Sequence, residues 1–117
     1  MKKILVVDDD QDLLSMIKGF LQRQGYEVAV TTSCEQGVEI FYSFRPGLLL
    51  LDINVGSEDG RVMCRKIKAR AENAHIPIIF ISANAEALAT YEEHGAVGAL
   101  DKPFDFMRLL ELIREHE

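Results

Sequence analysis

The chain has 117 residues, of which 48% are hydrophobic and 27% charged, the size and composition of a single folded domain. The net charge of −6 argues against a nucleic-acid-binding surface, and no apolar run approaches the roughly 18 residues of a membrane span. The first residues lead directly into a strand pattern rather than a signal peptide, so we expect a cytoplasmic protein whose partners include neither nucleic acid nor membrane.

Short apolar runs alternate with amphipathic segments along the whole chain. The runs at residues 3–7, 47–51 and 76–81 are nearly unbroken, as in parallel strands that are buried on both faces. Residues 26–30 alternate more strongly and predict an edge strand, and residues 97–100 predict a short last strand.

Apolar residues recur at helical spacing between these strands. The five predicted helices have their apolar positions within residues 13–21, 34–41, 62–71, 85–94 and 106–113. Asp10 and Ser33 are expected to cap the first two helices, and Gly25 ends the first. The fourth helix is alanine-rich, and only Leu88 and Tyr91 give it an apolar face. Five strands alternating with five helices predict one α/β domain over residues 1–117, with a parallel sheet between two helical layers.

Polar side chains follow four of the predicted strands. Asp8 and Asp9 follow the first, Asp52 the third, Ser82 the fourth and Lys102 the fifth. The carboxyl ends of parallel strands form the usual ligand-binding edge of an open sheet. Three converging carboxylates repel one another, and a hard divalent cation such as Mg²⁺ relieves that repulsion. The set combines a nucleophilic carboxylate, a metal and two donors for a phosphoryl group.

Other chemistry-bearing residues are expected to be structural. Cys34 and Cys64 lie among apolar helix positions without metal-ligand spacing, which predicts buried free thiols. His75, His94 and His116 lack partners at useful spacing and are expected at the surface.

Four motifs in order resemble the receiver domain of two-component response regulators over nearly the whole chain. They are Ile-Leu-Val-Val-Asp-Asp-Asp at 4–10, Leu-Leu-Asp-Ile-Asn at 50–54 with Asp-Gly at 59–60, Ile-Phe-Ile-Ser-Ala at 79–83, and Asp-Lys-Pro-Phe at 101–104. The resemblance implies a flavodoxin-like (βα)5 three-layer sandwich with strand order 2-1-3-4-5.

The resemblance also implies a role for each site residue. Asp52 is the expected phosphoacceptor, and the implied ligands of Mg²⁺, with Mn²⁺ as a second candidate, are Asp8, Asp9, Asp52 and the backbone carbonyl of Asn54. Ser82 and Lys102 are expected to bind the phosphoryl group, and the peptide bond between Lys102 and Pro103 is expected to be cis.

Three positions depart from the family pattern. Val55-Gly56 replaces the usual Met-Pro, which predicts a more mobile loop, and Ser82 replaces the commoner Thr. Ala99 stands where the family usually has Tyr or Phe, so the usual aromatic rotamer change cannot report the phosphorylated state.

The resemblance implies a signalling switch rather than an enzyme. The expected partners are a sensor histidine kinase or phosphotransfer protein and an unknown downstream effector, with the domain a monomer or a weak phosphorylation-dependent dimer. Phosphorylation is expected to act on the fourth helix, fifth strand and fifth helix. Because Asn54 and Asn84 flank the approach of water and neither is a base, self-dephosphorylation is expected to be slow to moderate.

Three other functions fit the sequence less well. A receiver-like protein-binding module without phosphorylation usually lacks an acidic-pair residue, Asp52 or Lys102, and all are present here. A flavodoxin-like cofactor binder needs a Gly- or Ser/Thr-rich first loop, which is acidic here. A phosphohydrolase with an aspartyl intermediate usually needs a general acid two residues after the nucleophile, where this chain has Asn54.

Overall fold

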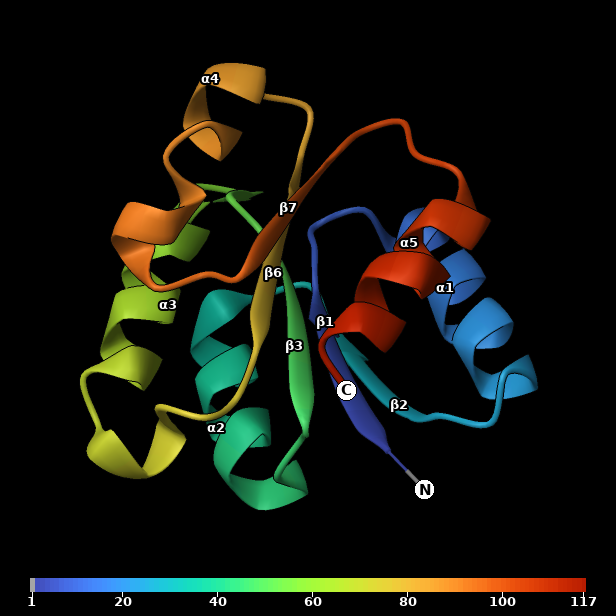
Figure 1. The fold of residues 1–117 in the computed structure, drawn as a ribbon, viewed down its shortest axis with the longest axis horizontal. Helices are drawn as coiled ribbons and strands as arrows, with labels where there is room; N and C mark the ends of the chain where they lie inside the picture. Colours follow the sequence, from blue (N-terminus) through green and yellow to red (C-terminus); the bar gives the residue numbers. More distant parts are fainter. Residues whose placement is uncertain (1) are drawn as a thin grey trace.

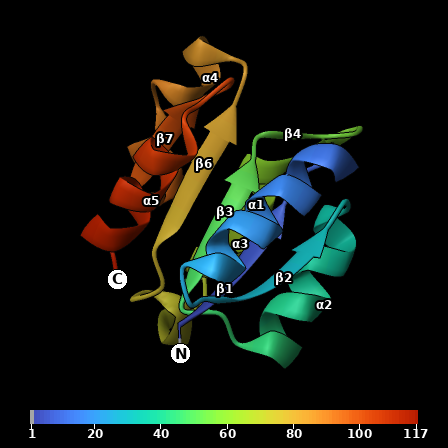
Figure 2. The ribbon, with the colours of Figure 1, turned by 90° about the vertical axis from the view of Figure 1, so that its right-hand side faces the viewer.

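The computed structural model describes residues 2–117, which form a five-stranded parallel sheet between two helical layers (Figures 1 and 2). The elements in chain order are β1 (Lys3–Val7), α1 (Gln11–Arg23), β2 (Glu27–Thr31), α2 (Cys34–Phe44), β3 (Leu48–Asp52), β4 (Asn54–Val55), β5 (Glu58–Asp59), α3 (Gly60–Lys68), the 3₁₀ turn η1 (Ala71–Asn73), β6 (Ile78–Ser82), α4 (Ala85–Leu88), the 3₁₀ turn η2 (Tyr91–His94), β7 (Gly98–Asp101) and α5 (Phe106–Glu115). No helix in this described range is both long and apolar enough to cross a bilayer.

The sheet order β2-β1-β3-β6-β7 confirms the predicted order 2-1-3-4-5 when the five strands of this sheet are counted along the chain. All four strand pairs are parallel, and Figure 2 shows the arrows of β2, β3 and β6 pointing the same way. The carboxyl ends of the strands therefore meet at one edge of the sheet.

The alternation of side chains along each strand divides the apolar core into two clusters. On β1, Ile4 and Val6 face the cluster covered by α1 and α5, while Leu5 and Val7 face the cluster covered by α2, α3 and α4. Figure 1 shows these two helical layers on opposite sides of the strands. Burial on both faces explains why the central strands read as unbroken apolar runs.

The predicted helix caps are present. The Asp10 side chain accepts a hydrogen bond from the Leu13 N–H, and the Ser33 side chain accepts one from the Gln36 N–H. Gly25, just beyond the end of α1, has φ +95°, a backbone conformation that glycine adopts without a steric penalty.

Two predicted helices are wrong in extent. The helix expected within 85–94 is one α-helical turn, α4, followed after Ala89–Thr90 by the 3₁₀ turn η2. The thin apolar face of this segment gives a continuous helix little to pack against. The third helix begins two residues before the predicted Val62 and ends at Lys68, so Ala71 lies in η1 instead.

The cysteine prediction is confirmed, because Cys34 and Cys64 are both buried and free. Of the three histidines expected at the surface, His75 is exposed, whereas His94 and His116 are half-buried. The expectation that they lack partners is wrong for His94, which contacts α3. Its Nδ1 lies 2.7 Å from Nη1 of Arg65, and its carbonyl accepts a hydrogen bond from Sγ of Cys64. This contact pairs residues 29 apart in the chain, which short-range spacing cannot reveal.

Candidate functional site at the carboxyl edge of the sheet

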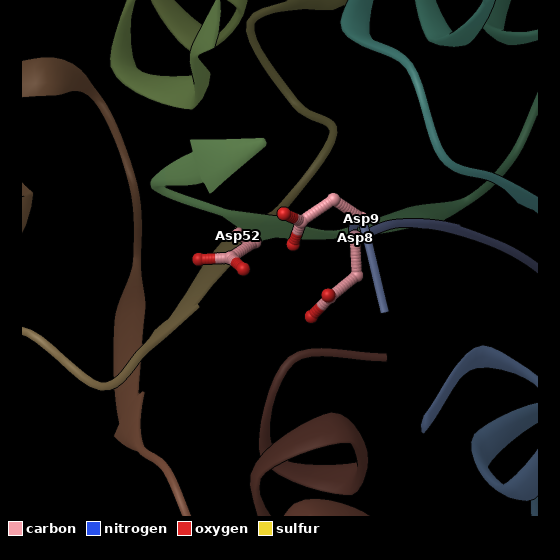
Figure 3. A group of neighbouring side chains, drawn as sticks. All are labelled: Asp8, Asp9 and Asp52. Atoms are coloured by element: carbon pink, nitrogen blue, oxygen red, sulfur yellow. The ribbon is translucent and has the colours of Figure 1, made fainter. Parts of the chain in front are cut away.

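Three carboxylates meet beyond the ends of β1 and β3. Asp8 and Asp9 directly follow β1, and Asp52 is the last residue of its neighbour β3. One oxygen from each carboxylate lies within 4.8 Å of the others, and the three side chains turn toward a common space (Figure 3). The parallel pairing of β1 and β3 therefore brings together residues that are far apart in sequence.

Lys102 supplies the positive charge of this site. It follows β7, its backbone N–H donates to the Ser82 carbonyl, and its peptide bond to Pro103 is cis, as expected. The Lys102 Nζ atom lies 2.9 Å from Oδ2 of Asp52 and 2.7 Å from Oδ2 of Asp8. One ammonium is thus shared between two buried carboxylates.

Burial sets the electrostatics of the pair. Asp8 is fully buried and Asp52 is 4% exposed. Burial raises the pKa of the Asp52 carboxyl and the nearby Asp8 charge adds to this, while hydrogen bonds from Lys102 and the Asn54 N–H only partly oppose it. Burial by itself lowers the pKa of Lys102, but its contacts with Asp8 and Asp52 outweigh this and raise that pKa overall.

The donor set fits a divalent cation. One ammonium cannot balance three carboxylates, and Oδ2 of the fully buried Asp8 has the shared Lys102 ammonium as its sole partner within residues 2–117. An all-oxygen set with excess negative charge is what Mg²⁺ prefers. Asp8, Asp9 and Asp52 can therefore hold such an ion, with Asp9 exposed and accessible.

The remaining predicted residues lie around this cluster. Asn54 is exposed, and its backbone N–H donates to Oδ1 of Asp52 at 3.1 Å. Ser82 is fully buried at the end of β6, where its hydroxyl accepts a hydrogen bond from the Asn84 N–H. The Asn84 side chain caps α4 by accepting from the Ala87 N–H.

Sequence reasoning missed how the segment after Asp52 is held. The sequence predicts a more mobile loop at Val55-Gly56 and gives no sign of the β4–β5 hairpin that residues 54–59 form, in which Val55 is 1% exposed. A Cβ atom on Gly60 would lie 2.0 Å from the Asp52 carbonyl oxygen, so only glycine fits there. The Asp-Gly pair at 59–60 was the available signal, because Asp59 caps α3 and Gly60 touches β3.

A parallel α/β sheet with an acidic cluster and a lysine at its carboxyl edge defines a class of proteins that handle phosphoryl groups or divalent cations at that edge. Within this class, the chain belongs to the response regulator receiver domain family, whose family model matches residues 4–114.

Relatives and solved structures agree with this assignment. The chain is 31% identical over 116 residues to the transcriptional regulatory protein YxdJ of Bacillus subtilis, covering 97% of this chain and 49% of YxdJ. It is 40% identical over 106 residues to the uncharacterized transcriptional regulatory protein YvcP of the same organism, covering 89% of this chain and 44% of YvcP. The chain thus spans about half the length of these relatives.

Two solved structures superpose over nearly their full lengths. The response regulator TrrA of Thermotoga maritima, in complex with Mg²⁺-BeF, has a TM-score of 0.89 and 27% identity, covering 100% of both chains. The BeF₃-activated receiver domain of RstA from Klebsiella pneumoniae has a TM-score of 0.88 and 26% identity, covering 98% of this chain and 97% of the other. The flavodoxin-like receiver fold predicted from the sequence is therefore confirmed.

Proposed function

We propose that residues 1–117 act as a phosphoacceptor domain, which takes a phosphoryl group onto Asp52 from the phosphohistidine of a sensor histidine kinase or phosphotransfer protein. The observation that carries this proposal is the buried Asp52 carboxylate, paired with Lys102 inside an acidic cluster that is open at Asp9. Receiver domains are signalling switches, and the proposed chemistry is limited to the domain's own phosphorylation and its reversal.

In the proposed transfer, an oxygen of Asp52 forms a bond to phosphorus as the bond between phosphorus and the histidine nitrogen breaks. The electron pair of that bond stays on the leaving imidazole. Lys102, whose Nζ lies 2.9 Å from Asp52 Oδ2, then donates to a phosphoryl oxygen. The Ser82 hydroxyl at the end of β6 is the second donor in this proposal.

The metal ligands in the proposal are Asp8, Asp9, Asp52 and the Asn54 backbone carbonyl. A bound Mg²⁺ or Mn²⁺ ion would neutralise the negative charge on the phosphoryl oxygens. The excess of carboxylates over cations, with Asp8 and Asp52 sharing the single Lys102 ammonium, supports this assignment.

The proposed output is a shift of α4, β7 and α5, which control a downstream effector. Support comes from the small amount of regular helix in this region, where α4 is a single turn. A pocket of ≈ 560 Å³ also lies beside Leu88, Tyr91 and Ala99. The two Bacillus relatives are named as transcriptional regulatory proteins, which supports an effect on transcription. We propose that the domain itself is a monomer or a weak dimer that forms on phosphorylation.

The test is phosphorylation by acetyl phosphate, followed by intact mass, with Mg²⁺, with Mn²⁺ and with EDTA. We expect a metal-dependent gain of one phosphoryl group in the wild type and none in Asp52→Asn. Asp101→Asn is the matched control, because Asp101 is exposed at the end of the neighbouring strand β7. A folded wild type that gains no phosphoryl group with saturating metal would instead support the protein-binding module that phosphorylation does not control.

A further inference from the structure

The β4–β5 hairpin lies between the phosphoacceptor strand and α3. Its two strands have two residues each, pair Asn54 with Asp59 and Val55 with Glu58, and turn at Gly56, whose φ is +62°. A two-stranded ribbon of this length is not stable on its own. Its position must therefore be set by the contacts it makes with the rest of the domain.

Two of these contacts reach the acidic cluster directly. The Asn54 N–H donates to Oδ1 of Asp52 at 3.1 Å, and the Gly56 N–H donates to Oδ2 of Asp9 at 3.3 Å. Any displacement of the hairpin therefore changes the surroundings of two of the three carboxylates.

Glu58 makes a third contact, with a different element. Its two carboxylate oxygens accept hydrogen bonds from the backbone N–H groups of Cys34, at 2.8 Å, and Glu35, at 3.2 Å. These are the first two residues of α2, whose N–H groups have no acceptor within the helix and form the positive end of its dipole. A carboxylate at this position makes charge-assisted hydrogen bonds, which are stronger than neutral ones.

We propose that Glu58 is a positioning residue for the metal site, an inference that rests on the proposed function. By anchoring β5 to α2, it fixes the partner strand β4, which carries the backbone carbonyl of Asn54. The same anchor holds the turn whose Gly56 N–H orients Asp9. Glu58 itself lies outside the three-carboxylate cluster found among residues 2–117, so it acts through these neighbours.

The experiment compares the wild-type chain with Glu58→Ala, Glu58→Gln and the control Glu35→Gln. Glu35 is exposed on the same first turn of α2, so its substitution removes one negative charge there and leaves the hairpin contact in place. One readout is amide hydrogen exchange at Asn54 and Gly56 in EDTA, measured by NMR. The other is the Mg²⁺ dissociation constant of the folded protein, from amide shift titration.

We expect Glu58→Ala to speed exchange at Gly56 and to weaken Mg²⁺ binding about 10-fold, as happens when groups that orient metal ligands are removed. Glu58→Gln keeps one oxygen acceptor without the charge and should fall between Ala and wild type, while Glu35→Gln should match wild type. A Glu58→Ala variant that melts earlier but binds Mg²⁺ as tightly as Glu35→Gln would overturn the proposal.

The two readouts also separate this inference from the proposed function. If the wild type bound no Mg²⁺, the proposed phosphoacceptor chemistry and the metal-positioning role would both fail. Amide exchange at Gly56 would then show whether Glu58 anchors the hairpin at all. Unchanged exchange in Glu58→Ala would contradict the anchoring role as well.

Discussion

The ammonium of Lys102 lies 2.9 Å from Oδ2 of Asp52, although 50 residues separate them in the chain. The same ammonium is 2.7 Å from Asp8, so neither buried carboxylate has a cation of its own. This shared pairing leaves the site with excess negative charge until a divalent cation binds. That excess should lower the free energy of unfolding of the metal-free domain.

We predict that Asp52→Asn raises the free energy of unfolding at pH 7 in EDTA by about 1 kcal/mol, the low end of the gain from replacing buried charges. The pKa of Asp52 is raised in the folded state, so its favourable contribution is complete below the unfolded pKa and is lost as pH rises through the folded pKa. At pH 7 the ionised carboxylate therefore destabilises the metal-free domain.

Urea unfolding in EDTA at pH 7 and at acid pH tests this prediction, with Asp101→Asn as the exposed control. The difference between Asp52→Asn and wild type should shrink as the pH falls and Asp52 becomes protonated in both states. Added Mg²⁺ should stabilise the wild type more than the variant, because an ion that binds only the folded state shifts the equilibrium by mass action. A variant less stable than wild type at pH 7 would contradict the electrostatic argument.

We predict that Gly60→Ala lowers the free energy of unfolding by about 3 kcal/mol, the upper part of the range for overpacked sites. The new Cβ would lie 2.0 Å from the carbonyl oxygen of Asp52, and the nearest atoms are all backbone atoms of Asp52 and Ile53, which have little room to relax. Gly19→Ala is the matched control, since its Cβ would meet only the end of the Arg23 side chain at 3.4 Å. That control should gain up to about 1 kcal/mol from helix propensity. Equal urea midpoints for the two variants would show that the loop after Asp52 can move aside.

We predict slow reaction of both cysteines with a thiol reagent at pH 8. Burial raises the pKa of Cys34 and of Cys64 to about 11, and nearby Glu58 contributes at Cys34. Since the thiolate is the reactive form and an unperturbed thiol has a pKa of about 8.5, labelling should be roughly 100-fold slower than in urea.

The sign of the linked stability change follows from the same shift. A thiol with a raised pKa contributes stability that is complete below about pH 8.5 and is lost as pH rises through its folded pKa of about 11. The free energy of unfolding should therefore fall across this alkaline range. In the labelling experiment, a folded-state rate equal to that of the unfolded chain would show that α2 and α3 open readily.

The acidic cluster could be predicted from sequence because it depends only on strand ends. Unbroken apolar runs indicated two parallel strands, and parallel pairing then places Asp8 and Asp52 at the same edge. The same argument, applied to the end of the last strand, places Lys102 at this edge. These predictions needed the order of the strands but no detail of side-chain packing.

The hairpin and the region around α4 could not be predicted in this way. Strands of two residues, such as Asn54–Val55, are too short to show a periodicity, and the anchor of Glu58 on α2 joins residues 24 apart. The break after Leu88 and the contact of His94 with Arg65 likewise depend on how η2 packs on α3. Tertiary contacts of this kind override local propensity, which is a weak guide for short segments.

We predict that phosphorylated protein decays slowly once the donor is removed, over minutes or longer at 25 °C. Neither Asn54 nor Asn84 can act as a base toward water, and the Asn84 side-chain oxygen is already occupied by the Ala87 N–H. Intact mass followed over time measures the decay. Because a general base contributes about 100-fold or more, Asn54→Ala should change the rate far less than that. A half-life of seconds would mean that another group activates water.

The last prediction concerns the pocket beside Ala99. Ala99 is half-buried on β7, and the pocket of ≈ 560 Å³ next to it is also lined by Leu88, Tyr91 and Pro103. This space can receive an aromatic ring, so Ala99→Tyr should change the free energy of unfolding by no more than about 1 kcal/mol, a small effect for a partly buried position.

The new ring should also report phosphorylation. Because it would lie between α4 and β7, its NMR resonances should shift when Asp52 is phosphorylated, whereas those of Tyr42, on α2 and hydrogen-bonded by the Asn73 side chain, should not. Val97→Tyr is the matched control, since Val97 is exposed just before β7 and is not among the residues that line this pocket. Loss of stability well beyond that of Val97→Tyr would show that the pocket does not receive the ring. A ring signal insensitive to phosphorylation would place the conformational change away from α4 and β7.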